Sequence, residues 1–184
     1  MRADHLRIAA RVIKKGGIVA YATESCFGLG CDPRNIRSVQ KIVRIKRREP
    51  DKGLILIADH FSRFGRYLDH VPEKYRDDIF SSWPGPYTWL IPAKPDVSFW
   101  LRGQFETIAV RVTAHRQARR LCQMLGSALV STSANKAGRP SLKTSQAVIR
   151  EFGSEIDYVL PGLVGKDATP STIRDSRNGN LIRM

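Results

Sequence analysis

Apolar side chains recur along the chain with two spacings, one typical of helices and one typical of buried strands. In residues 4–15 they fall at i, i+3, i+4 and i+7 on one helix face: Leu6, Ala9, Ala10 and Ile13. The pair Gly16-Gly17 predicts the end of that helix. The apolar run of residues 18–21 follows, and it predicts a buried strand with polar side chains at its carboxyl end.

The same alternation continues to the end of the chain. Further helices are predicted over residues 35–48, 114–125 and 144–152, with a looser helical region over 61–80 that breaks near Pro72. Further strands are predicted over residues 53–58, 87–91, 107–112, 128–130, 171–175 and 181–184. The turn Asn178-Gly179 between the last two strands predicts an antiparallel pair.

This order of elements predicts the class of fold. Strands and helices alternate without repeats, low-complexity runs or a linker, so we expect one α/β domain over residues 1–184. Its mixed, twisted sheet would be flanked by helices. In such sheets ligands bind outside the carboxyl ends of the strands, and we expect the site there.

The charge balance is the unusual feature of the composition. The 184 residues are 42% hydrophobic and 26% charged, as in ordinary globular proteins, but 31 Lys and Arg face 17 Asp and Glu, for a net charge of +14. Such an excess favours nucleotides, nucleic acids or anionic lipid, and a solubilising surface is the alternative. Because no segment approaches the roughly 18 apolar residues of a membrane span, and residues 1–11 lack a secretion signal, we expect a cytoplasmic protein.

Several kinds of site are excluded by the residues present. The cysteines Cys26, Cys31 and Cys122 form no CxxC pair, and the four histidines show no metal spacing, so free thiols are expected and no metal ligands. No GxxxxGK[ST] or GxGxxG sequence occurs, which excludes a P-loop and a Rossmann nucleotide site.

Four polar clusters follow predicted strands or helices: residues 23–25, residues 46–48 with Lys52, Arg111, and residues 131–135. Each has an ordinary alternative, because such groups also cap helices, complement helix dipoles or form loops. Together they combine hydroxyl and amide groups, which hydrogen-bond phosphate or ribose oxygens, with cations that neutralise phosphate charge. The residues alone therefore predict a phosphate-binding α/β domain with an open cationic cleft.

Seven motifs in a fixed order carry a resemblance to a known family. They are Tyr21-Ala-Thr-Glu-Ser-Cys-Phe-Gly-Leu-Gly30, Lys46-Arg-Arg48, Asp51-Lys-Gly-Leu-Ile55, Trp83-Pro-Gly-Pro-Tyr-Thr88, Ala109-Val-Arg-Val112, Ser131-Thr-Ser-Ala-Asn135 and Pro170-Ser-Thr-Ile-Arg-Asp175. With them the whole chain resembles the YrdC-like family of threonylcarbamoyl-AMP synthases, in its short (TsaC-type) form. Two positions depart from the family pattern. Ala22 replaces a usual proline, which should loosen the turn, and Ile57 aligns with a histidine that contacts threonine in longer relatives.

The resemblance implies an activity and a set of site residues. L-threonine, bicarbonate or carbon dioxide, and ATP would give threonylcarbamoyl-AMP and pyrophosphate, for the N6-threonylcarbamoyladenosine (t6A) modification of tRNA position 37. Lys46 and Arg48 are the implied catalytic residues. The implied ATP contacts are Arg48, Lys52, Thr107, Ser133, Asn135, Ser141 and Arg183. The implied threonine contacts are Thr23, Arg111, Ser131 and Ser171, with Arg111 taking the carboxylate. Mg²⁺ would arrive with ATP and bridge its phosphates.

The remaining positive charge leaves partners and alternatives open. Eight cations on predicted helix faces could contact tRNA or form a solvated surface: Lys14, Lys15, Arg37, Lys41, Arg44, Arg116, Arg119 and Arg120. Hand-off to the tRNA threonylcarbamoyl-transferase complex is expected. One alternative is a non-catalytic module of the same fold that binds double-stranded RNA or tRNA. Others are an adenylating enzyme with another carbamoyl donor, as in hydrogenase-maturation proteins, and an uncharacterised paralogue.

Overall fold

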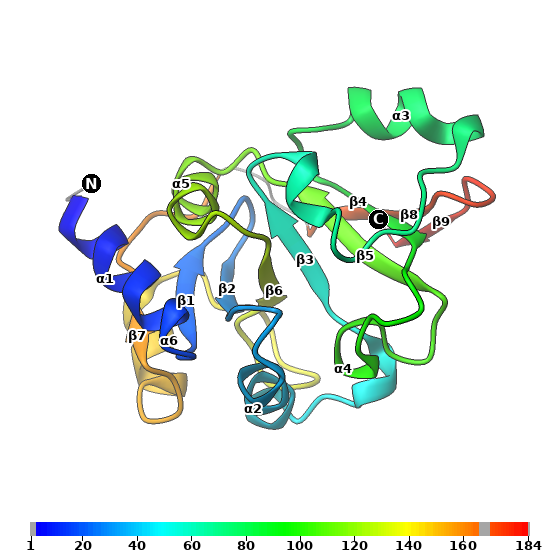
Figure 1. Cartoon of the computed structure of the whole chain (residues 1–184). Helices are drawn as coiled ribbons and strands as arrows, with labels where there is room; N and C mark the ends of the chain where they lie inside the picture. The colour runs from blue at the N-terminus through cyan, green and yellow to red at the C-terminus, as the bar shows by residue number, and fades with distance from the viewer. Residues whose placement is uncertain (1–2, 166–169, 184) are drawn as a thin grey trace.

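One mixed sheet runs through the computed structural model, which describes residues 3–165 and 170–183. Its strands are β1 (Val19–Ala22), β2 (Phe27–Gly30), β3 (Ile55–Ala58), β4 (Tyr87–Pro92), β5 (Thr107–Val112), β6 (Leu129–Ser133), β7 (Tyr158–Val159), β8 (Thr172–Asp175) and β9 (Leu181–Arg183). They pair in the order β7-β1-β2-β6-β3-β5-β4-β8-β9. Figure 1 shows β7 and β1 at one end of this sheet and β8 and β9 at the other.

The sheet is mixed because both kinds of pairing occur in it. β1 with β7, β3 with β5, and β4 with β8 run parallel. The pairs β1–β2, β2–β6, β3–β6, β4–β5 and β8–β9 run antiparallel. As a result, strand ends of both polarities meet at each edge of the sheet.

The helices are α1 (Ala3–Lys14), α2 (Ile36–Lys46), α3 (Arg76–Ser81), α4 (Phe99–Arg102), α5 (Arg116–Leu125) and α6 (Ser145–Phe152). Three short 3-10 segments are η1 (Pro50–Lys52), η2 (Phe61–Phe64) and η3 (Glu73–Tyr75). Local chemistry sets their ends: the Asn35 side chain accepts from the Ser38 amide at the start of α2, and Gly126 ends α5 in the left-handed conformation.

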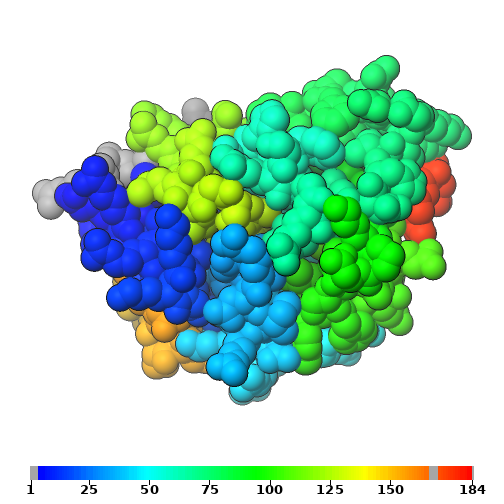
Figure 2. All heavy atoms as spheres, in the orientation of Figure 1, coloured from blue at the N-terminus to red at the C-terminus, as the bar shows by residue number. Residues whose placement is uncertain are grey.

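Alternate strand residues divide the core between the two faces of the sheet. Val19 and Tyr21 pack with α1 and α5, whereas Ala20 and Ala22 pack with α2 and α6. In the view of Figure 2, side chains of the helices and of residues 60–100 cover the sheet. Since a fully buried large apolar side chain contributes about 1.5–3 kcal/mol, these two layers are the main source of stability.

Most sequence predictions of elements are confirmed. The helices over 4–15, 35–48, 114–125 and 144–152 are present with ends shifted by at most two residues, and so are the predicted strands and the antiparallel β8–β9 pair. Residue 184 of the strand predicted over 181–184 lies outside the described residues. The helical prediction for 61–80 is wrong over most of its length, since only η2, η3 and α3 form there. The predictions missed β2, β7 and α4. The predicted strand 128–130 continues to Ser133, so part of the expected 131–135 loop is strand.

The structure also shows the state of the three thiols and where possible metal ligands lie. Cys26, Cys31 and Cys122 are free, and burial raises the pKa of the Cys31 and Cys122 thiols. Within residues 3–165 and 170–183, no three His, Cys, Asp or Glu side chains cluster as metal ligands would. Over the same ranges, no helix is long and apolar enough to cross a membrane.

Candidate active site

A cavity of about 580 Å³ lies on the sheet face that α1 and α5 cover only in part. Strand alternation builds its floor: Thr107, Ala109 and Arg111 of β5 line it, while the intervening residues of β5 face the opposite core. With a rise of about 3.3 Å per strand residue, Thr107 and Arg111 stand about 13 Å apart. The cavity is therefore long enough for two ligands placed end to end.

Residues from distant parts of the chain close this cavity. β6 contributes Ser131 and Ser133, and Ser171 stands directly before β8. A Cβ atom at Gly28 would lie 3.4 Å from both Ser131 Oγ and Thr23 Cγ2. Glycine thus leaves space where β2, β6 and the turn after β1 meet.

The structure brings the predicted site residues together. All of them except Lys46 and Asn135 line the cavity: Thr23, Arg48, Lys52, Thr107, Arg111, Ser131, Ser133, Ser141, Ser171 and Arg183. The expected location needs correction, because the cavity extends along the face of the sheet and not beyond the carboxyl ends of its strands. The physical reason is the mixed sheet, in which neighbouring strands such as β4 and β5 end on opposite sides.

Most charged side chains on the cavity wall are basic. They are Arg48, Lys52, Arg102, Arg111, Arg177 and Arg183, against the single acid Asp175. Burial, and then the charges of Arg111 and Arg48, lower the pKa of Arg183, so Arg183 lies within electrostatic reach of both other arginines of the wall.

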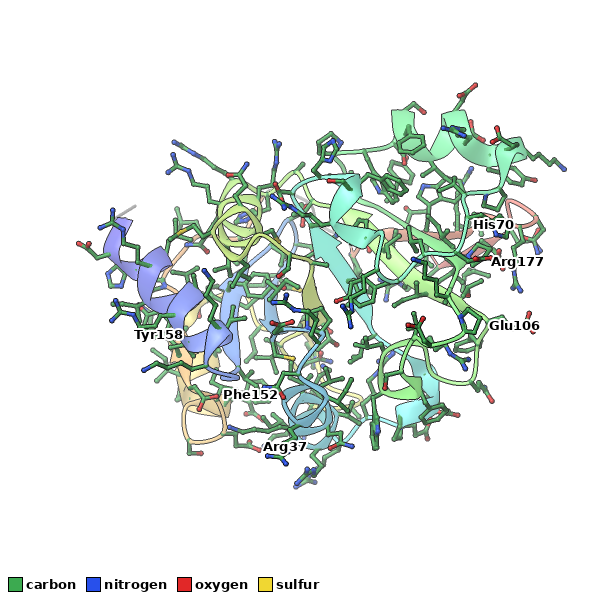
Figure 3. The ribbon with its side chains drawn as sticks, viewed as in Figure 1. Arg37, His70, Glu106, Phe152, Tyr158 and Arg177 are labelled. Atoms are coloured by element: carbon green, nitrogen blue, oxygen red, sulfur yellow. The ribbon has the colours of Figure 1, made fainter. Side chains whose placement is uncertain are left out.

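Several of these cations already have partners. Glu49 lies 2.6 Å from Lys52. Asp175 accepts from Arg177 Nη2 at 2.8 Å, and Arg177 lies beside Glu106 where β8 and β9 lie (Figure 3). These acidic partners offset part of the positive charge of the wall. That the cavity carries a net positive charge therefore stays a prediction.

Lys46 and Asn135 lie directly behind the wall and hold Ser133. The Lys46 ammonium donates to Ser133 O at 2.5 Å, Asn135 O at 2.7 Å and Asn135 Oδ1 at 3.1 Å. Ser133 Oγ donates to Asn135 Oδ1 at 2.7 Å, and Asn135 Nδ2 donates to Arg139 O at 2.6 Å. All three ammonium hydrogens of Lys46 are thus used within the protein. We call this cluster the Lys46 clamp.

Burial changes the ionisation of the clamp. Desolvation, followed by the charge of Arg48, lowers the pKa of Lys46 to about 8. The three oxygen acceptors favour the protonated form. Because residues 133–135 stand between the Lys46 ammonium and the cavity, Lys46 Nζ does not line the wall. Its charge reaches the cavity only as an electric field across these residues.

A left-handed residue at the end of α2 separates the two members of the Lys-x-Arg motif. Arg47 is the C-cap with φ of 50°, and its side chain is exposed. Lys46 before it is buried, and Arg48 after it turns to the cavity. Arg48 Nε donates to Gly53 O at 3.2 Å and Nη2 to Lys52 O at 3.3 Å, and burial lowers the Arg48 pKa. These bonds fix its guanidinium at the wall.

At the other end of β5, hydroxyl groups and a buried ion pair surround the wall. Thr23 Oγ1 donates to Cys26 O at 2.7 Å, and Ser171 Oγ lies 2.9 Å from Thr88 Oγ1. Arg111 Nη2 lies 3.4 Å from Glu24 Oε2, with both side chains about one-tenth exposed. This end combines small hydroxyls with a guanidinium, a set of groups that can bind a small carboxylate.

The two departures from the family pattern have clear structural settings. The Ala22 amide, which a proline would lack, donates to Gln117 Oε1 at 3.3 Å, and Gln117 Nε2 donates to Pro161 O at 2.7 Å. This hydrogen bond ties the Ala22 amide to α5, and the expected loosening of the turn stays a prediction. Ile57 is fully buried opposite Arg111 in the strand register and does not line the cavity.

Sequence reasoning missed part of the wall. Arg102, Phe105, Asp175, Arg177 and Ile182 line the cavity without having been predicted. Asp175 ends one of the seven family motifs but was given no role there. No sequence signal singled out the other four, since α4 was not predicted and residues 176–184 were noted only as part of a hairpin.

The eight cations that could contact tRNA or form a solvated surface are distributed over both faces of the sheet. Arg37, Lys41 and Arg44 belong to α2, whereas Arg116 and Arg120 belong to α5 on the opposite face. Lys41 also pairs with Asp157 at 3.4 Å. No single face unites all eight.

Comparisons with known proteins agree with this geometry. The model of the Sua5/YciO/YrdC family, described as "Telomere recombination", matches residues 11–184. A protein of Nitrosococcus oceani named threonylcarbamoyl-AMP synthase is 52% identical over 97% of this chain and 96% of its own. One of the same name from Methylobacillus flagellatus is 46% identical over 96% of this chain and 98% of its own.

Among solved structures, P. abyssi Sua5 complexed with L-threonine matches with a TM-score of 0.91 at 29% identity. The match covers 100% of this chain and 55% of that one, so the chain spans about half the length of that Sua5. The chain belongs to the Sua5/YciO/YrdC family.

Proposed function

We propose that this protein is an L-threonylcarbamoyladenylate synthase, an enzyme of the nucleotidyltransferase class. The observation that carries the proposal is the single cavity in which the implied ATP and threonine contacts meet, Lys46 and Asn135 standing directly behind. Relatives of nearly the same length that carry this activity in their names support it.

The two ends of the cavity suit the two substrates. Arg111, Ser131 and Thr23 form an end with hydroxyls and one guanidinium, fit for an amino acid with a carboxylate and a hydroxyl. Toward the other end, Arg48 and Lys52 supply cations for phosphates. About 13 Å along β5, from Thr107 to Arg111, separates these two ends.

The chemical step joins these ends. The threonine nitrogen adds to the carbon of carbon dioxide, derived from bicarbonate, and gives a carbamate after loss of a proton. A carbamate oxygen then attacks the α-phosphorus of ATP, the bond from that phosphorus to the bridging oxygen breaks, and pyrophosphate leaves with the electron pair. Both reactants are anions, so positioning and charge stabilisation by Arg48, Arg183 and the field of Lys46 supply most of the rate.

Mg²⁺ belongs to this proposal as part of the substrate MgATP. The single acid on the wall, Asp175, is engaged by Arg177 through both carboxylate oxygens. The described residues accordingly offer no cluster of carboxylates for a resident ion. The phosphates themselves would hold the metal, with its charge adding to that of the arginines.

We further propose that the product passes to the tRNA threonylcarbamoyl-transferase complex in the cytoplasm, and that tRNA binds the exposed basic helices. The exposed cations of α1 and α5, two helices on the same face of the sheet, support the binding of tRNA. Binding through phosphate contacts would weaken steeply as salt rises.

The deciding experiment measures pyrophosphate release from MgATP with bicarbonate, with and without L-threonine. Release that requires threonine is expected from the native protein, and D-threonine serves as a matched control substrate. A non-catalytic RNA-binding module of the same fold would release none. Equal release with and without threonine would refute the proposed reaction.

A further inference from the structure

Glu24 is a buried acid that stands beside the cavity without lining it. Its Oε1 accepts from Thr113 Oγ1 at 2.6 Å, from the Ala114 amide at 3.1 Å and from the His115 amide at 3.3 Å. Three donors from one short segment fix this oxygen. Since that segment directly follows β5, the carboxylate is anchored to the strand that carries Arg111.

The second oxygen of Glu24 has a different environment. Oε2 lies 3.4 Å from Arg111 Nη2, and neither Oε2 nor Arg111 Nε has a hydrogen-bond partner among the described residues. The carboxylate thus meets only one edge of the guanidinium and does not grip it through two parallel bonds. A guanidinium has five N–H donors, so donors of Arg111 are left for a ligand.

The charges nearby explain why Arg111 needs this neighbour. Arg183 senses the charges of both Arg111 and Arg48, which places three guanidinium groups around one cavity. Glu24 is the only acid paired with Arg111 in the described part of the chain. Without it, repulsion from Arg183 would favour a swing of Arg111 out of its place.

We propose that Glu24 is a positioning residue for threonine binding: anchored by residues 113–115, it holds Arg111 against the cavity wall in the orientation that receives the substrate carboxylate. The inference rests on the proposed function for the identity of that carboxylate. The dependence of the Arg111 orientation on Glu24 is independent of the proposed function.

The test uses Glu24→Gln, which keeps an oxygen for the donors of residues 113–115 but removes the charge that faces Arg111. We expect the threonine KM to rise at least tenfold, while the ATP KM and kcat stay within about threefold. In an Arg111→Ala background, Glu24→Gln should change the threonine KM less than twofold, because the residue it positions is gone. Thr113→Val removes one of the three anchor donors but keeps the Glu24 charge, so a smaller rise of the threonine KM than in Glu24→Gln is expected.

A second measurement does not depend on activity. The arginine Nε–Hε signals of the ¹⁵N-labelled protein are recorded, with the Arg111 signal assigned by its loss in Arg111→Lys. In the native protein this signal should be separated from those of solvent-exposed arginines, and in Glu24→Gln it should move into their region.

The outcomes separate the two proposals. Native protein without threonine-dependent turnover refutes the proposed function, and the Arg111 signal then still tests Glu24. An unmoved signal, or an unchanged threonine KM in an active enzyme, overturns the positioning role. Should Glu24→Gln not fold, Glu24→Asp withdraws the carboxylate by one methylene, and an unchanged KM and signal there would overturn it as well.

Discussion

Replacing Lys46 by methionine should separate the catalytic value of its charge from its cost to folding. A fall of the Lys46 pKa from its ordinary 10.5 to about 8 corresponds to roughly 3 kcal/mol for keeping the buried ammonium charged at neutral pH. Its three hydrogen bonds to the Ser133 and Asn135 oxygens return about 1.5 kcal/mol each. Because the two contributions nearly cancel, we expect Lys46→Met to lower the free energy of unfolding by only about 1–2 kcal/mol at pH 7.

The pH dependence of stability gives the sharper measurement. Between pH 8 and 10.5, the unfolded state binds the Lys46 proton more tightly than the folded state. The free energy of unfolding of the native protein should therefore rise with pH there, relative to Lys46→Met, by up to about 1.4 kcal/mol per pH unit. Below pH 8 the difference should be constant.

Urea titrations of both proteins from pH 7 to 10 measure this difference, and Lys41→Met, an exposed lysine on the same helix, is the matched control. The control should track the native protein within about 0.5 kcal/mol and keep full activity. Lys46→Met should lose activity by at least about a hundredfold, the scale for one preorganised electrostatic group. A stability difference that does not change with pH would refute the low pKa, and retained activity would remove Lys46 from the catalytic residues.

Three further changes probe other parts of the site. Arg48→Ala should reduce threonine-dependent pyrophosphate release at least about a hundredfold, with the free energy of unfolding changed by less than about 2 kcal/mol. Arg44→Ala, an exposed arginine in the last turn of the preceding helix α2, is the control. Equal activity of both variants would exclude Arg48. Ala22→Pro removes the amide that donates to Gln117 but restricts the unfolded chain. The two effects on the free energy of unfolding, each about 1 kcal/mol, should offset in urea unfolding. A decrease of that free energy by more than about 3 kcal/mol would show a larger role for the hydrogen bond. Although burial alone would raise the pKa of Glu24, the Arg111 charge and hydrogen bonds lower it from its ordinary 4.5. The stabilisation by ionised Glu24 is therefore present above pH 4.5 and lost as pH falls through the pKa of the folded state. In urea titrations from pH 3 to 6, Glu24→Gln should lack this acid-sensitive part of the stability, and identical pH profiles of both proteins would contradict it.

Periodicity predicted most elements because the core uses the two spacings so regularly. Where it did not, local composition misled: β2 contains two glycines, Gly28 and Gly30, which weaken a strand pattern. In residues 61–80 aromatic side chains such as Phe61, Phe64 and Phe80 suggest a helix face, but they pack with Trp83 in a local aromatic cluster. Tertiary contacts, not helix periodicity, determine that segment.

The site was predictable to the extent that its groups occur in motifs. The role of Glu24 was not, because its hydrogen bonds join residues about ninety positions apart. The alternative interpretation of residues 23–25 as a helix cap resembles what Glu24 does, since Glu24 accepts from amides directly before α5. The helix it borders, however, is about ninety positions away in the sequence and not the next one along the chain. Likewise, the burial of Lys46 behind Ser133 follows from where β6 ends beside α2, which no spacing reveals.

In the proposed reaction, one cavity brings the threonine carbamate to the innermost phosphate of ATP. To follow both substrates at once, the protein is incubated with bicarbonate, ¹⁴C-labelled L-threonine and ATP labelled with ³²P at the α-phosphate. We expect one product that carries both labels, formed only when bicarbonate is present and lost in Arg48→Ala. Labelled AMP that forms without any doubly labelled product would contradict it.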